Sequence, residues 1–139
     1  METTKLLPEL IEALWARHVW ATGCDPASIL RLRAPSGDEL HIERSQAPRT
    51  VRIRYYLAAA SAEAILDLEV LLLKERPGEW APLEFCRART GHHVYARMDD
   101  DGKGVIVLDP DNQAACARYC DGWAFALREQ GWLEQGVAI

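Results

Sequence analysis

The sequence predicts an α+β fold: one antiparallel sheet of about six strands, with an N-terminal and a C-terminal helix packed on one face. Apolar residues alternate with polar ones through much of residues 28–107, which is typical of strands with one buried face. Short turn sequences separate these stretches and favour antiparallel neighbours. Amphipathic helical patterns stand near both ends. At 139 residues, the chain is expected to form a single domain, 1–139.

The first helix is expected to start after Thr3 or Thr4, either of which can cap it, and to reach about residue 21. The Gly23 and Asp25-Pro26 breakers then end it. Its apolar face is Leu7, Leu10, Ile11, Leu14 and His18.

Strand patterns follow, separated by turns rich in Gly, Pro and Asp. In residues 50–57, the side chains of Arg52, Arg54 and Tyr56 are predicted to point outward. In residues 67–73, Asp67 and Glu69 are predicted to point outward together. Residues 58–64 (AAASAEA) fit either a helical turn or a wide connection. The five strands expected before residue 90 are 28–34, 39–44, 50–57, 67–73 and 80–89.

A hairpin leading into a helix closes the chain. Residues 94–98 and 105–107 flank the turn Asp99–Gly104, and the return strand is expected to be buried on both faces. Asp109 and Pro110 then start a helix, and Gly131 ends it. Phe125 lies almost opposite the apolar stripe, so it is either exposed or covered by something else. That stripe is Cys116, Tyr119, Cys120, Trp123 and Leu127.

Composition excludes several classes of function. The net charge of −5 argues against non-specific nucleic-acid binding, which needs a basic surface. No apolar run reaches the length of a membrane span. The first residues lack the layout of a secretory signal, so a cytoplasmic location is expected. The four cysteines are then expected to be reduced thiols.

The motifs that invite a metal or catalytic interpretation have simpler explanations. Cys116 and Cys120 lack the paired spacing of zinc ligands and lie on an apolar stripe. The Asp99–Gly104 run lacks the bidentate acid that a calcium loop needs, because Pro110 stands there. Cys86 with His92 or His93 matches no known nucleophile setting. No metal ligand, catalytic residue or cofactor is therefore assigned.

Asp67, Glu69 and Glu84 leave two alternatives open. Carboxylates on one face of a sheet can perform acid–base or metal chemistry, with a histidine as partner. They can equally form ion pairs with Arg52 and Arg54, which is the more common outcome.

The succession RIRYY, DLEVLL, EWAPLEF, TGHHVY, DDDGKG and ALREQGWL resembles a family of uncharacterised small domains from bacteria, phages and plasmids. The resemblance covers roughly residues 50–133. The chain departs from the family pattern at Leu68, at Trp132 and in the alanines of 58–62. The resemblance implies a mobile-element context. It transfers no catalytic residue, since the family has no assigned activity.

Surplus aromatic residues indicate an interface. Phe125, Trp80 and Tyr56, with Arg52 and Arg54, are the residue types enriched where proteins bind each other. We therefore expect a protein partner or self-association, with no nucleic acid and no membrane.

The preferred hypothesis is a non-enzymatic, protein-binding accessory protein of a mobile element that inhibits or modulates a host defence or replication protein. The alternative is a small hydrolase or metal-dependent enzyme using Asp67, Glu69, Glu84 and a histidine.

Overall fold

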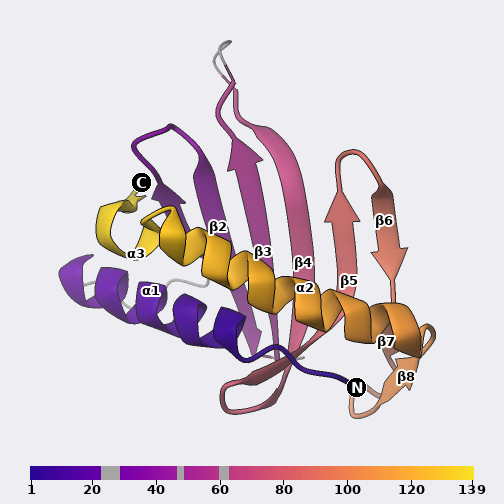
Figure 1. Ribbon diagram of the computed structural model, residues 1–139. Helices are drawn as coiled ribbons and strands as arrows, with labels where there is room; N and C mark the ends of the chain where they lie inside the picture. Colours follow the sequence, from indigo (N-terminus) through magenta and orange to yellow (C-terminus); the bar gives the residue numbers. More distant parts are fainter. Residues whose placement is uncertain (23–28, 47–48, 60–62) are drawn as a thin grey trace.

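The computed structural model describes residues 1–22, 29–46, 49–59 and 63–139. It is an α+β fold built from a seven-stranded antiparallel sheet, a separate two-stranded sheet and helices on one face (Figure 1). The large sheet runs in the order β6-β5-β4-β3-β2-β1-β9. Its strands are β1 (Ile29–Arg33), β2 (Glu39–Gln46), β3 (Arg49–Leu57), β4 (Ile65–Arg76), β5 (Glu79–Arg87), β6 (Gly91–Val94) and β9 (Val137–Ala138).

The helices α1 (Leu6–Thr22) and α2 (Pro110–Glu129) lie side by side across one face of the large sheet (Figure 1). The core lies between the two helices and the sheet, because the apolar side chains of both helices pack against the inward side chains of the strands. The fully buried side chains include Leu7, Leu10, Ile11, Leu14, Leu32, Leu40, Ile42, Ile53, Leu72 and Leu127. The predicted fold class and the predicted apolar face of the first helix are therefore confirmed.

The hairpin before α2 differs from the prediction. The strands β7 (Ala96–Met98) and β8 (Val105–Val107) form their own sheet instead of extending the large one. Tyr95 separates β6 from β7, and its carbonyl accepts hydrogen bonds from the N–H groups of Leu108 and Asp109. The return strand is not buried on both faces: Ile106 is 39% and Val107 is 43% exposed. This prediction was wrong because β8 pairs only with β7, outside the main layers.

Both ends of α2 match the predicted signals. The side chain of Asp109 accepts a hydrogen bond from the N–H of Asn112. Gly131 has φ = 85°, a left-handed conformation that favours glycine at a helix end. The chain then turns into the short α3 (Trp132–Gln135), which buries Trp132.

The start of α1 is capped from another helix. Thr4, a predicted cap residue, donates its hydroxyl hydrogen to Asp121 of α2 at 2.6 Å. The same Asp121 oxygen accepts hydrogen bonds from the N–H groups of Lys5 and Leu6, both at 3.0 Å. Thr4 also forms an isolated β-bridge with Trp80. The N-terminal segment is thereby fixed to both the helix layer and the sheet.

Of residues 58–64, the positions 60–62 fall outside the described part of the chain. No described helix is long and apolar enough to cross a membrane.

Candidate functional site on the open face of the sheet

The large sheet has one covered and one open face, because α1 and α2 both pack on the same side (Figure 1). We call the uncovered side of β2–β6 the open face. Strand alternation places Arg52, Arg54 and Tyr56 on it, while Val51 and Ile53 are completely buried. These outward residues of β3 form a row near the middle of the sheet, as the sequence predicted.

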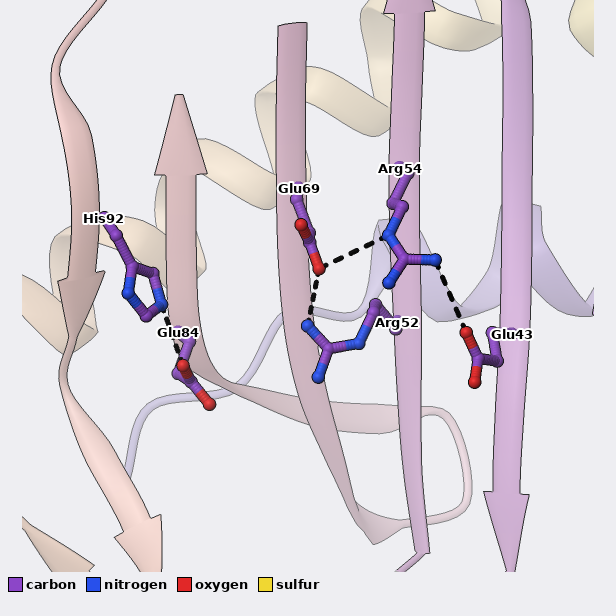
Figure 2. Close-up of polar contacts among 6 residues, drawn as sticks. All are labelled: Glu43, Arg52, Arg54, Glu69, Glu84 and His92. Carbon is purple, nitrogen blue, oxygen red and sulfur yellow. Dashed lines mark hydrogen bonds and ion pairs between the residues drawn. The ribbon is translucent and has the colours of Figure 1, made fainter. Parts of the chain in front are cut away.

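Ion pairs hold the two arginines of this row in place (Figure 2). One oxygen of Glu69 on β4 contacts Nη1 of Arg52 and lies 3.4 Å from Nε of Arg54. Nη1 of Arg54 also lies 3.5 Å from a carboxylate oxygen of Glu43 on β2. The register places Arg54 directly opposite Glu69, and Arg52 directly opposite Glu43. Cross-strand pairs of opposite charge stabilise a sheet modestly, by about 0.2–1 kcal/mol each, so their main effect is to restrict the side-chain positions.

Tyr56 completes the row through an aromatic contact. Its ring centroid is 4.5 Å from that of His41 on β2, with the two ring planes inclined by 45°. His41 in turn bonds Glu39 at 3.0 Å, and this contact, with a smaller one from Arg33, lowers the pKa of Glu39. The open face therefore presents tyrosine, arginine and glutamate side chains that already contact one another.

A hollow of about 250 Å³ lies on the open face toward β6. Beside it, His92 Nε2 lies 2.8 Å from an oxygen of Glu84 (Figure 2). Cys86 on β5 stands directly opposite His92 in the register. The residues lining the hollow are Arg52, Glu69, Leu71, Glu84, Phe85, Cys86 and His92.

The predicted carboxylate group is only partly assembled. Glu69 and Glu84 both line the hollow, whereas Asp67 does not. The register between β3 and β4 shifts at Tyr55/Tyr56 and leaves Asp67 as an extra residue, so the simple alternation that paired Asp67 with Glu69 fails there. Burial is the main cause that raises the pKa of Tyr55, and the nearby charge of Asp67 adds to it. The predicted grouping of Asp67 with Glu69 and Glu84 is therefore not found around the hollow.

Within the part of the chain that the structure describes, no group of three or more His, Cys, Asp or Glu side chains is arranged to hold a metal ion. At the Asp99 turn, the N–H of Gly104 donates to Asp99 at 3.1 Å, and the N–H of Lys103 donates to Asp101 at 2.8 Å. The turn's own backbone therefore engages the carboxylates that suggested a calcium loop.

The two cysteines of α2 are core residues. Cys116 is 5% and Cys120 is 0% exposed. The contact with Cys116 and burial both raise the pKa of Cys120, which keeps that thiol protonated. Both residues pack as small apolar side chains.

The predicted interface residues do not form one surface. Trp80 is only 2% exposed and packs in the core, so its predicted role in contacting a partner is wrong. Its backbone forms a β-bridge with Thr4, which places the N-terminal segment beside this part of β5. Phe125 is 62% exposed, but it projects from the helix layer, on the other side of the molecule from the open face. Arg52, Arg54 and Tyr56 remain together. The side chain of Trp20, an aromatic residue of the first helix, lies outside the described part of the structure.

Glu43, His41 and His92 belong to the same face but were not among the predicted interface residues. The alternation of residues 39–46 carries the signal for His41 and Glu43, since Leu40 and Ile42 between them are fully buried. His92 carries no such signal, because all four residues of β6 are exposed.

Comparisons with family models, with curated proteins and with solved structures find no match for this chain.

Proposed function

We propose that this chain is a non-enzymatic accessory protein that binds another protein through the open face of its sheet. The observation that carries the proposal is the central row of Arg52, Arg54 and Tyr56, held by neighbouring side chains on an uncovered face. Tyrosine and arginine are the residues most often responsible for binding energy at protein interfaces. Restricting them before binding lowers the entropy lost on association.

The chemistry of the row defines the partner surface. A guanidinium group has five N–H donors, and the described ion pairs engage only Nη1 and Nε of Arg54. The remaining donors of both arginines can bind carboxylates or backbone carbonyls of a second protein. Tyr56 beside them offers an aromatic surface. The fitting partner is therefore a folded protein with acidic side chains around an apolar centre.

The biological setting of the proposal rests on the family resemblance. A protein from a phage or plasmid that binds without catalysing a reaction would inhibit or modulate a host defence or replication protein. Phe125, which is 62% exposed, offers a separate contact on the helix layer.

Site-specific photocrosslinking tests the proposal. A benzoylphenylalanine residue in place of Tyr56 is expected to give one discrete adduct in cells. The same group at Arg118, an exposed position on α2, is expected to give none. Combining Arg52→Gln with Arg54→Gln should remove the adduct, whereas Arg89→Gln with Arg118→Gln removes two exposed cations elsewhere and should leave it.

Three results would count against the proposal: equal labelling from positions 56 and 118, labelling that survives the Arg52 and Arg54 substitutions, or no adduct at all. An adduct of twice the 15.6 kDa chain mass would identify self-association through the open face instead of a foreign partner. Light scattering of the purified protein would check that outcome independently.

A small hydrolase is the second candidate, and the hollow with Glu84, His92 and Glu69 is the observation that favours it. Its weakness is that one oxygen of Glu69 already contacts two guanidinium groups, so that oxygen is not free to engage a substrate. Hydrolysis of a panel of ester and phosphoester substrates that disappears in His92→Gln but persists in His93→Gln would favour this candidate over the binding protein.

A further inference from the structure

A second hollow, of about 300 Å³, lies on the helix-covered side of the sheet, between the first half of α2 and the β5–β6 hairpin. Its buried lining includes Tyr95 and Cys116, which are 8% and 5% exposed. Phe85 and Tyr119 line it as well and are only partly covered. The volume is at the lower end of the range found for small-molecule sites, roughly 300–1,000 Å³.

The aromatic rings around this hollow are held by contacts within the protein. Phe85 and Tyr119 pack edge to face, with ring centroids 5.3 Å apart and planes at 78°. The rings of Tyr95 and His93 are parallel within 2°, at a centroid distance of 6.5 Å. Rings fixed in this way offer a prearranged apolar surface that suits a flat aromatic group.

Arg87 supplies positive charge at the rim. Its guanidinium carbon lies 5.8 Å from the ring centroid of Tyr119. Unlike Arg52 and Arg54, Arg87 has no carboxylate at ion-pair distance among the residues that the structure places. Burial raises the pKa of Tyr119, and the charge of Arg87 is the largest influence that lowers it. Arg87 thus places a positive charge beside the Tyr119 ring.

We propose that this hollow binds a planar aromatic carboxylate, with the ring among Phe85, Tyr95 and Tyr119 and the carboxylate on Arg87. The planar guanidinium fork matches a carboxylate in geometry and charge. The hydroxyl of Thr90, which also lines the hollow, can donate to the same anion. The ligand chemistry is shared by free aromatic acids and by peptides that end in an aromatic residue, and the test distinguishes these sources.

Indole-3-acetate is the probe, and its neutral isostere indole-3-acetamide is the matched control ligand. Amide chemical shifts around α2 and β5 are expected to change saturably with indole-3-acetate, with a dissociation constant of about 1 mM or lower. Arg87→Gln should weaken binding of the acid about tenfold, since it removes a charge-assisted contact. The same substitution should change binding of the amide less than about twofold.

Two further variants separate the site from general effects. Arg89→Gln removes a cation from the same hairpin without altering the lining, and it should leave binding within about twofold of wild type. Ala115→Leu fills the hollow from an exposed helix position, where leucine is a good helix former. It should abolish binding of both probes. Arg118→Leu places the same side chain at an exposed position of the same helix that does not line the hollow. It should leave the binding of both probes unchanged.

The proposal is overturned if no saturable shift occurs up to about 10 mM probe, if Arg87→Gln and Arg89→Gln weaken binding equally, or if Ala115→Leu still binds. Each variant is first checked for an unchanged circular dichroism spectrum. A Gly-Gly-Trp peptide with a free carboxylate, compared with its amidated form, identifies the source: Arg87-dependent binding of the free peptide points to a peptide terminus, and binding of indole-3-acetate alone points to a small acid.

Discussion

Asp121→Ala is expected to destabilise the fold by about 2–5 kcal/mol, because this one side chain connects the two helices and caps one of them. Its Oδ1 atom accepts hydrogen bonds from Thr4 Oγ1, from the N–H of Lys5 and from the N–H of Leu6. Losing a helix cap costs about 1–2 kcal/mol. Leaving the hydroxyl of Thr4 without this partner costs about another 1–3 kcal/mol, since Thr4 is completely buried.

Urea unfolding followed by tryptophan fluorescence measures the effect. With an m-value of about 2 kcal/mol per molar, the middle of the usual range, the unfolding midpoint should fall by about 1–2.5 M. Asp121→Asn keeps an acceptor oxygen without its charge and should cost only about 1 kcal/mol. Arg128→Ala is the matched control, since it breaks the exposed ion pair with Glu9 between the same two helices. It should cost less than about 1 kcal/mol.

The reasoning is refuted if Asp121→Ala unfolds at the same urea concentration as Arg128→Ala. That result would mean that water replaces Asp121 at the start of α1, and that packing alone fixes the helix. A lower m-value in Asp121→Ala, with an unchanged midpoint, would indicate instead that the N-terminal segment has detached in the native state.

Three further stability predictions follow from single positions. Gly131→Ala should destabilise the fold by about 1–2 kcal/mol, because Gly131 has a positive φ. Gly122→Ala should stabilise it by up to about 1 kcal/mol, because an added Cβ there meets nothing within 4 Å. Urea midpoints that shift in the same direction in both variants would contradict these two predictions. Burial, followed by the charge of Arg17, lowers the pKa of His18 below 6.5. The unfolded state therefore binds more protons, and the stability of the fold should decrease as the pH drops through and below that value. Thermal melts of His18→Gln should show a smaller decrease, and a pH profile identical to that of the wild type would contradict the reasoning. Trp80→Ala should cost about 3–5 kcal/mol, and a variant as stable as wild type would show that Trp80 is not a core residue.

Much of the candidate site was predictable because alternation along one strand decides which face each side chain occupies. The outward direction of Arg52, Arg54 and Tyr56 follows from three buried neighbours on the same strand, Val51, Ile53 and Tyr55. The identity of the facing strands was harder to predict, since it depends on pairing between distant segments. The predicted ion pairs of Glu69 with Arg52 and Arg54 are present, whereas Glu43 was identified as a partner of Arg54 only in the folded sheet.

The sequence by itself determined the fold class, the apolar face of α1, the Asp109 cap and the Gly131 stop, because each depends on periodicity or on the conformational preference of one residue. The predicted stripe of α2 holds at Cys116, Cys120 and Leu127, whereas Tyr119 is 37% exposed. Only the tertiary structure decided the positions of Asp67, Trp80 and Asp121. A β-bulge between two strands displaced Asp67, a bridge to the N-terminal segment accompanied the burial of Trp80, and a cap supplied from another helix engaged Asp121. All of these involve residues far apart in the chain, whose contacts local sequence patterns do not encode.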